Sequence, residues 1–238
     1  MPYGVPGVPI ISPDAGPIPP VPLQQPQNLF RFGEQTIWST FFFPGGAGAA
    51  ALASTQNRLF STPLGQVGQG YTNAMSIAET NLKEGGRVPS GVAYDVFGIA
   101  AEFSLYSQAA DAGGISGEPV DTAAEIGQLT SCIHNAVLSW DFTQTQVDIC
   151  PMILAGAGGG AFGAVAQNAA GANSGNMNNG NGSIWMYRKH PVALPGNSTF
   201  SIVLRFGSRA RTQNNANLNA FEVRTTLLGY YKNVIEIG

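Results

Sequence analysis

The sequence predicts an antiparallel all-β sandwich. Its longest alternating stretch, residues 221–237, places Phe221, Val223, Leu227 and Ile235 on one face and mostly polar residues on the other. Strands with one buried face have this period of two. We count about six to eight such segments, joined by long loops, and none of the regular helices that a βαβ protein places between its strands.

The composition favours a protein that works in an assembly. Charged residues make up only 11% of the 238 residues, whereas 44% are hydrophobic and 31 are Gly. An average soluble domain has roughly 25% charged residues. The surface is therefore either made polar by amides and hydroxyls or covered by other subunits. The net charge of −3 offers no overall attraction for nucleic acid.

Residues 1–34 are expected to form a Pro-rich extended arm outside a main domain of residues 35–238. Residues 1–29 contain no Lys or Arg, so the arm lacks the charges that neutralise phosphates. One interpretation is a disordered linker. We favour an arm that lies on neighbouring subunits, because its residues other than Pro are largely apolar. Its expected subunit contacts are Pro6, Pro9, Pro13 and Pro19.

The first half of the main domain contains two predicted strands. The first, 36–43, is aromatic and β-branched and stops at Pro44. A short helix is predicted over 72–81, with Thr72 as its cap. The second strand, 92–106, is apolar on both faces, which is typical of a central strand or one covered by a neighbour. Its alternation places Ala93, Phe97, Ile99, Ala101, Phe103 and Leu105 on one face, and Val92, Tyr94 and Val96 on the other.

The second half continues the pattern. A helical turn is expected at 119–127, and a strand at 132–142 with Ala136, Leu138, Trp140 and Phe142 facing inward. Residues 143–146 are either a turn or a bulge, and 147–154 is apolar again. A Gly/Asn-rich loop over 155–183 is long enough to be functional or mobile. Strand 200–206 and the turn 212–219 lead into the last strand, which should bend at Gly229.

The chain offers little for catalysis or for metal binding. Cys132 and His134, with Cys150 or Asp148 as further ligands, fit no familiar zinc spacing. The two cysteines would face each other across a hairpin turn at 140–144, and we expect them to be reduced core residues. Since no Gly-x-Ser-x-Gly elbow is present, we expect neither a catalytic site nor a metal nor a cofactor.

Two further motifs have ordinary explanations. Gly158 to Gly163 match G-x-G-x-x-G, but no Asp or Glu lies between Asp148 and Glu222 to bind a ribose. A dehydrogenase is therefore our weakest hypothesis. The densest basic group, Arg205, Arg209 and Arg211, is interpreted as a solvated or subunit-contact feature rather than a phosphate site.

The start of the chain and its uncharged run carry two further expectations. Met1-Pro2-Tyr3 lacks the basic start and apolar run of a signal peptide, so the protein is expected to be made in the cytoplasm. The long uncharged run 149–187 consists mainly of Gly, Ala and Asn. It is too weakly apolar to predict a membrane span.

Two strand lead-ins carry a resemblance to a known family. Val88-Pro89-Ser90-Gly91 opens one long strand, and Leu194-Pro195-Gly196-Asn197 opens another. With the arm-like N-terminus and the closing strand, this pattern resembles viral jelly-roll coat proteins, most closely those of tailless icosahedral bacterial and archaeal viruses. The resemblance covers most of residues 36–238 and consists of loose turn-and-strand patterns.

The resemblance implies an eight-stranded jelly roll that self-assembles into a virion and performs no catalysis. With 238 residues, the chain is long for one jelly roll and short for two fused jelly rolls. We favour a single roll with long loops and keep two compact rolls as the alternative. The implied partners are many copies of the chain, other capsid proteins such as penton and minor proteins, and the membrane that such shells often enclose. No direct contact with nucleic acid is expected.

A β-sandwich spike or adhesin is the alternative function. In that case the Gly/Asn-rich segment 155–183 would contact a receptor or a glycan. Assembly state separates the two hypotheses, because a coat protein forms capsomers or shells.

Overall fold

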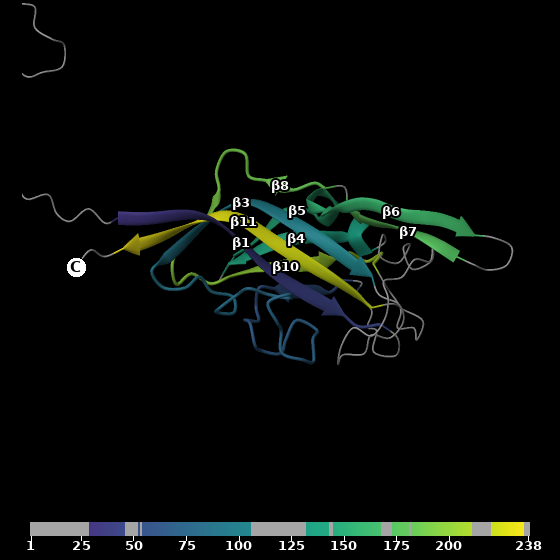
Figure 1. Cartoon of the computed structure of the whole chain (residues 1–238), viewed down its shortest axis with the longest axis horizontal. Coiled ribbons are helices and arrows are strands. Elements are labelled where there is room, and N and C mark those ends of the chain that lie inside the picture. The colour runs from purple at the N-terminus through teal and green to yellow at the C-terminus, as the bar shows by residue number, and fades with distance from the viewer. Residues whose placement is uncertain are drawn as a thin grey trace, which may run out of the picture.

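The chain folds as an all-β sandwich of two antiparallel sheets (Figure 1). The computed structural model describes residues 29–45, 52, 54–105, 132–142, 145–167, 173–180, 182–210 and 220–235. Of residues 29–32, 105, 158–167, 173–180 and 234–235 it describes the backbone alone. The predicted contacts Pro6, Pro9, Pro13 and Pro19, the helical turn 119–127 and the turn 212–219 lie outside the described residues.

The first sheet is built on three long strands. β1 (Leu29–Phe43), β11 (Phe221–Ile235) and β3 (Val92–Leu105) lie in the order β1-β11-β3. Two short strands, β8 (Trp185–Met186) and β9 (Val192–Leu194), pair with successive parts of β3 on its other side. β8 and β9 thus form one interrupted edge strand.

The second sheet has four strands. β2 (Gln56–Leu59), β10 (Phe200–Phe206), β4 (Ala136–Phe142) and β5 (Thr145–Pro151) lie in the order β2-β10-β4-β5. β4 and β5 pair in antiparallel register, Phe142 with Thr145 and Asp141 with Gln146, so residues 145 and 146 belong to β5, whereas residues 143 and 144 lie outside the described residues. A 3-10 helix, η2 (Met152–Ala155), follows β5.

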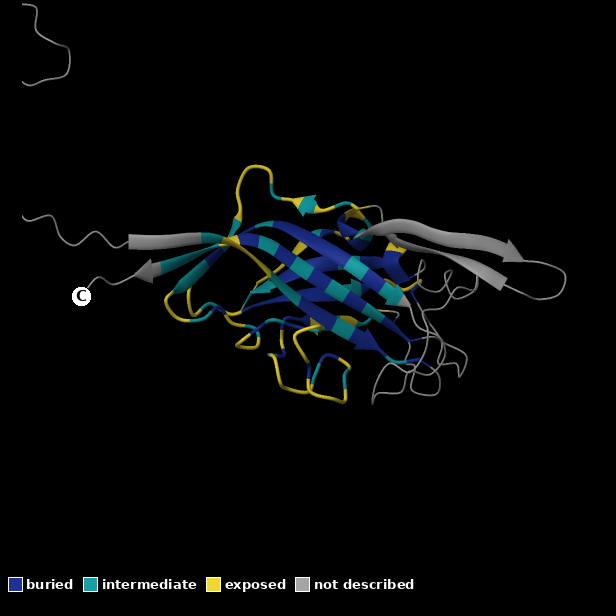
Figure 2. Cartoon of the chain, viewed as in Figure 1, coloured by how far each residue is buried: buried dark blue, intermediate teal, exposed yellow. Residues whose placement is uncertain are grey.

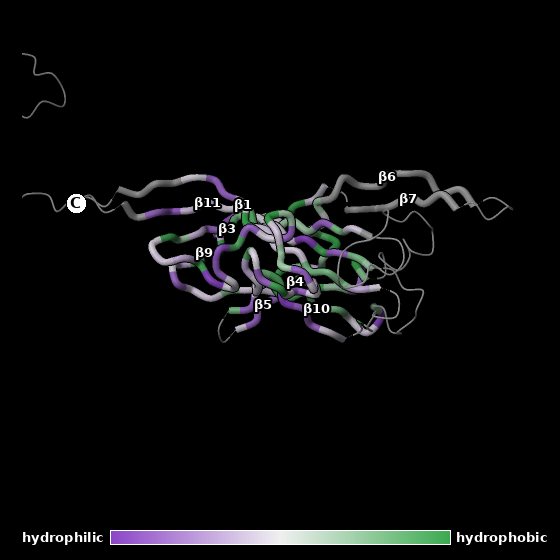
Figure 3. The backbone as a smooth tube through the Cα atoms, turned by 60° about the horizontal axis from the view of Figure 1, so that its bottom comes forward, coloured by the Kyte–Doolittle hydropathy of each residue, from purple (hydrophilic) through white to green (hydrophobic). Residues whose placement is uncertain are grey.

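The core lies between the two sheets, where buried positions from both layers meet (Figures 2 and 3). Phe43 of β1 stacks on Phe221 of β11 at 4.6 Å and meets Phe206 of β10 edge-on at 5.5 Å. Each fully buried aromatic or aliphatic side chain contributes about 1.5–3 kcal/mol relative to exposure. Among the largest buried side chains are Phe103, Ile99, Leu138, Leu194 and Ile202.

The predicted register of β11 is confirmed over its first nine residues. Phe221, Val223, Thr225 and Leu227 are at most 3% exposed, whereas the even-numbered residues 222, 224 and 226 are half-buried. The bend expected at Gly229 stays a prediction, because β11 continues through Gly229, which pairs with Gln35 of β1, and the register shift beside it comes from an extra residue in β3. The strand ends at Ile235 rather than at residue 237.

The predicted faces of β3 are wrong in its first half. Tyr94 and Val96 lie in the core, whereas Ala93 and Phe97 are only half-buried. Leu228 pairs with Gly98 and Gly229 with Val96, so Phe97 is an extra residue in the ladder. A bulge reverses the alternation after it. Ile99, Ala101 and Phe103 therefore share one face, as predicted, but this face is the core side that they share with Val96 rather than with Phe97.

Two predicted boundaries are corrected. β1 begins at Leu29, so 29–34 form a strand that pairs with residues 230–235 of β11 and belong to the sheet rather than to an arm. These pairs need only backbone groups, which explains why side-chain alternation did not reveal them. Cys132 to His134 are helical, and β4 starts at Ala136. Ala136, Leu138 and Trp140 are buried and Phe142 is partly buried, as expected.

The predicted helix over 72–81 is wrong. The segment contains a single turn at 77–79, closed by the Thr80 amide donating to the Ser76 carbonyl. Its start is capped at Ser76 rather than Thr72, because the Glu79 carboxylate accepts hydrogen bonds from the Ser76 amide and hydroxyl. The turn is held by contacts to β1 and β11, including the Arg224 guanidinium donating to the Ala78 carbonyl.

The predicted loop 155–183 is also corrected. Residues Ala157–Gln167 (β6) and Asn173–Gly180 (β7) pair as an antiparallel hairpin that projects from one end of the sandwich (Figure 1). The Gly- and Asn-rich sequence has no alternation of apolar and polar residues that would predict a strand. Backbone hydrogen bonds form the ladder regardless of side-chain pattern.

Candidate functional site

One lateral side of the sandwich is closed by the chain itself. There, residues 60–82 run along the free edge of β1. The Phe42 amide donates to the Gln69 carbonyl at 2.9 Å, and the Trp38 amide donates to the Asn81 side chain at 3.0 Å. Unpaired edge strands template pairing with other chains. This edge is therefore protected.

Gln69 is the centre of the closed side. Its side chain, 7% exposed, accepts from the amides of Ser61 and Thr62 and donates to the Ser39 hydroxyl and the Thr40 carbonyl. The next residue, Gly70, has φ +85, and a Cβ there would lie 1.8 Å from the Phe42 carbonyl oxygen. A glycine is required at that position because the backbones approach so closely.

The other lateral side contains a cleft of about 460 Å³ between the edge strands β5 and β8–β9. Two exposed apolar side chains, Val147 at 49% and Met186 at 46%, flank it. Ligand sites are commonly concave, apolar and of this size. The cleft is lined by Trp140, Phe142, Ile149, Trp185, Tyr187 and Val192, among others.

Aromatic side chains form the floor of the cleft. Trp140 is 3% exposed, stacks on Phe142 at 5.4 Å, and donates its indole N–H to the Tyr187 hydroxyl at 2.7 Å. This bond links the two sheets at their open side. Burial raises the pKa of the Tyr187 hydroxyl, and burial also raises the pKa of the nearby Cys150 thiol to about 11. Both groups are therefore neutral at physiological pH.

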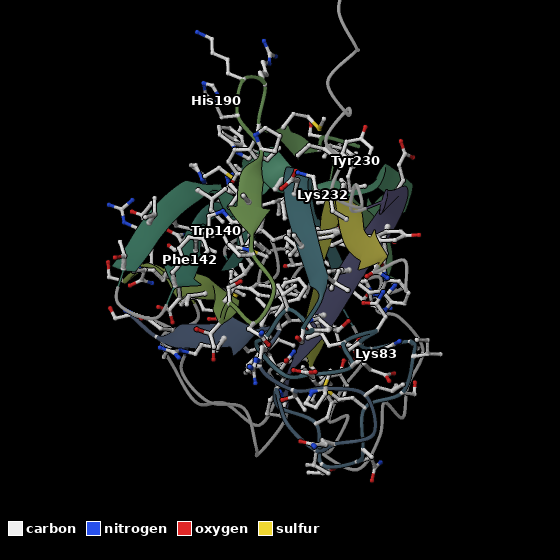
Figure 4. All side chains as sticks on the ribbon, turned by 90° about the vertical axis from the view of Figure 1, so that its left-hand side faces the viewer. Lys83, Trp140, Phe142, His190, Tyr230 and Lys232 are labelled. Carbon is white, nitrogen blue, oxygen red and sulfur yellow. The ribbon has the colours of Figure 1, made fainter. Side chains whose placement is uncertain are left out.

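The rim of the cleft is basic. Arg188, Lys189 and His190 are exposed in the loop between β8 and β9, and Figure 4 shows His190 on that loop above Trp140 and Phe142. The acid of the lining, Asp148, forms an ion pair with Arg205 at 2.7 Å and accepts a hydrogen bond from Ser139. Its charge is thus offset, and the rim favours anionic groups.

The predicted basic cluster is only partly described. Arg205 lies on β10, and its guanidinium forms an ion pair with Asp148 of β5. This charge is therefore paired within the second sheet. Arg209 is exposed in the turn after β10. Arg211 lies outside the described residues. Which of them contact another subunit stays a prediction.

An apolar patch on the outer face of the first sheet was not predicted. Ile184, Met186 and Tyr230 are 43%, 46% and 42% exposed, and Phe97 packs against Tyr230 at 5.0 Å. A Cβ added to Gly98 would touch Met186, Leu228 and Ile184, which places these side chains around that glycine. Apolar patches of this kind mark interaction sites. The bulge at Phe97 turns that ring outward into the patch.

The candidate metal and phosphate residues are not brought together. No group of three His, Cys, Asp or Glu that could hold a metal occurs among the residues that the structure describes. Cys132 and Cys150 are buried and form no disulfide, as predicted, whereas His134 is exposed. Gly158 to Gly163 lie within β6, so the described backbone has no helix start after the motif to receive a pyrophosphate.

No helix in the described part of the chain has the length and apolar character needed to cross a membrane. Comparison with known proteins finds no matching family model, no matching curated protein and no matching solved structure.

The sequence contains one signal for the cleft that our sequence analysis missed. Trp185 and Tyr187 directly precede Arg188, Lys189 and His190, which is the densest juxtaposition of aromatic and basic residues in the chain. Trp140, which completes the floor, lies 47 residues before Tyr187 in the sequence. Only the pairing of the strands reveals that they meet.

Proposed function

We propose that this chain is a structural coat protein, a jelly-roll subunit that self-assembles in many copies into the shell of a tailless icosahedral virus. The order of strand pairing carries the proposal.

The pairing is nested. Counting β8 and β9 as one strand, the two sheets contain eight strands, and the first pairs with the last, β1 with β11. The second pairs with the seventh (β2 with β10), the third with the sixth (β3 with β8–β9), and the fourth with the fifth (β4 with β5). A long hairpin folded over into two sheets has this pattern, which is the topology of a jelly roll. A single pair of facing sheets supports one roll rather than two.

Surface properties support assembly. The low charge content leaves a surface suited to burial by neighbours, and the patch of Ile184, Met186 and Tyr230 is exposed on the outer face of β3 and β11. Large self-assembling interfaces have apolar centres with polar rims. The ribbon formed by the start of β1 and the end of β11 extends beyond the sandwich (Figure 1), where it is accessible to a neighbour.

The further partners follow from the same proposal. Other capsid proteins, such as penton and minor proteins, would complete the shell, and a viral membrane would lie beneath it in a membrane-containing virion. The net charge of −3 supports a shell that does not bind its genome directly.

The β6–β7 hairpin supports a second candidate function. It projects from the sandwich like the loop of a spike or adhesin, which would place Ala157 to Gly180 against a receptor or glycan. A coat protein can carry such a hairpin on the outside of its shell.

Assembly measurements test the proposal. Purified protein should form capsomers or shells in light scattering and electron micrographs. Met186→Glu places a charge in the apolar patch and should shift the protein to monomers, whereas Val67→Glu, at a side chain that is 60% exposed on the closed side, should leave assembly intact. A monomer or small oligomer that binds glycan and never assembles would contradict the coat proposal.

A further inference from the structure

We propose that the cleft between β5 and β8–β9 is the docking site for the Pro-rich N-terminal segment, residues 1–28, of a second copy of this chain. The segment would bind as a polyproline II helix. The inference rests on the proposed assembly function and names the contact that links neighbouring subunits.

The cleft has the surface that such a helix requires. Pro-rich segments dock into grooves lined by aromatic rings, because a preformed polyproline II helix loses little conformational entropy on binding. Phe142, Trp185 and Tyr187 are partly exposed in a cleft of about 460 Å³. Their rings are held in place by the core side of the sandwich.

Tyr187 also supplies a hydrogen-bond donor. Its hydroxyl oxygen accepts the Trp140 indole N–H, so the hydroxyl hydrogen is directed elsewhere. A polyproline II helix has no internal hydrogen bonds, and its carbonyls need donors from the partner. Tyr187 can donate to one of these carbonyls while it still holds Trp140.

The N-terminal segment has the matching sequence. It repeats the P-x-x-P spacing at Pro6 and Pro9, at Pro17 and Pro20, and at Pro19 and Pro22. Between these repeats it carries Asp14, and residues 1–28 contain no Lys or Arg. The rim of Arg188, Lys189 and His190 therefore attracts the segment and has no like charge to repel.

The position of β1 favours a neighbour's segment over the chain's own. β1 is at one edge of the first sheet and the cleft is at the opposite edge, and the β1–β11 ribbon carries the chain away from the sandwich (Figure 1). At about 3.1 Å per residue, the 28 residues before Leu29 extend roughly 85 Å as polyproline II, enough to reach a neighbouring subunit.

Cysteine cross-linking between two variants of the full chain tests the proposal. One population carries Asp14→Cys and the other Lys189→Cys, and they are mixed under assembly conditions and then oxidised. We expect a disulfide-linked dimer of twice the 24.8 kDa chain mass. Lys83→Cys, exposed far from the cleft in Figure 4, replaces Lys189→Cys in the control and should give little dimer. The native Cys132 and Cys150 are buried and contribute little.

The segment's prolines provide a second variant. Pro17→Ala with Pro20→Ala, added to the Asp14→Cys chain, should reduce cross-linking by at least about fivefold, since the residues that fill aromatic grooves dominate such interfaces. Both substitutions precede β1 in the sequence and change none of the residues that the structure describes, so we expect the sandwich to fold unchanged, which circular dichroism of the variant checks.

The outcomes separate the two proposals. Particles in electron micrographs without the Asp14–Lys189 cross-link would overturn the docking site and leave the coat function standing. Equal yields with Lys83→Cys would also overturn it. A chain carrying both cysteines that closes its own disulfide as a dilute monomer would show docking within one copy and would overturn the exchange between copies. The absence of any assembly would count against the coat function itself.

Discussion

The two lateral sides of the sandwich are finished in different ways. At the β1–β2 side, residues 60–82 cover the sheet edge, and the buried Gln69 side chain satisfies polar groups of β1 and of its own segment. At the β5 and β8–β9 side, an aromatic cleft remains, bridged by the bond between Trp140 and Tyr187.

This difference shows which side of the sandwich is covered by the chain's own residues and which side leaves surface accessible to a partner. A buried polar network is stable when every member is paired, and the closed side meets that condition at Gln69. The open side leaves aromatic area and a basic rim accessible to solvent. The free energy of unfolding should therefore depend on hydrogen bonds of Gln69 at the closed side and on burial of Cys150 and Tyr187 at the open side.

The largest effect is expected from breaking the closed side. Gln69→Ala leaves the amides of Ser61 and Thr62 and the Thr40 carbonyl without their partner, which should lower the free energy of unfolding by about 3 kcal/mol. Gln66→Ala, at an exposed glutamine of the same segment, should change it by less than about 0.5 kcal/mol. Urea unfolding measures both. Equal values would mean that residues 60–82 do not hold the edge.

The second effect concerns pH at the open side. Burial raises the pKa of the Cys150 thiol from 9.0 to about 11, so the unfolded chain releases this proton at lower pH than the folded chain. The contribution of the neutral thiol to the free energy of unfolding is complete below about pH 9. It is lost as the pH rises toward about 11, and the loss is at most about 2 kcal/mol. Tyr187, whose pKa is raised as well, acts in the same direction.

Unfolding under reducing conditions at about pH 7, 9 and 11 checks this dependence. Cys150→Ala should flatten the decline in stability above about pH 9. Ile149→Ala destabilises the same strand without removing the thiol and should keep the wild-type slope. If the free energies of unfolding of the two variants decline in parallel above about pH 9, the thiol is not responsible for the loss of stability at alkaline pH.

The smallest effect is expected from the bridge across the open side. Tyr187→Phe removes the acceptor of the buried Trp140 N–H and should cost about 1 kcal/mol. Tyr230→Phe, at a tyrosine that is 42% exposed, should cost less than about 0.5 kcal/mol. Thermal unfolding compares them. A neutral Tyr187→Phe would show that water replaces the hydroxyl and that the open side is wetter than its aromatic lining suggests.

Alternation predicted the strands whose two faces differ. In β11, Phe221, Val223 and Leu227 face the core, and charged residues on the opposite face contact segment 60–82 or β3. The Tyr71 hydroxyl donates to Glu222, and Lys232 pairs with Asp95. The predicted polar face is therefore only partly free, because charges on it also hold neighbouring elements in place.

Other features gave no local signal. The bulge at Phe97 depends on the register between β3 and β11, and a one-residue insertion cannot be located from either strand alone. The β6–β7 hairpin has no alternating pattern at all. Of the candidate site residues, Arg205 is in an ion pair within the chain, and the cleft was missed because its members come from four separate strands.

By itself, the sequence determined the all-β class, the inward residues of β4 and β11 and the burial of both cysteines. These properties follow from side-chain period and hydrophobicity, which act over a few neighbouring residues. Tertiary structure alone decided the nested pairing, the reversal at Phe97, the closed side and the aromatic cleft. Each of those requires backbone or side-chain contacts between residues far apart in the chain, and local patterns contain no information about which distant partner a strand will choose.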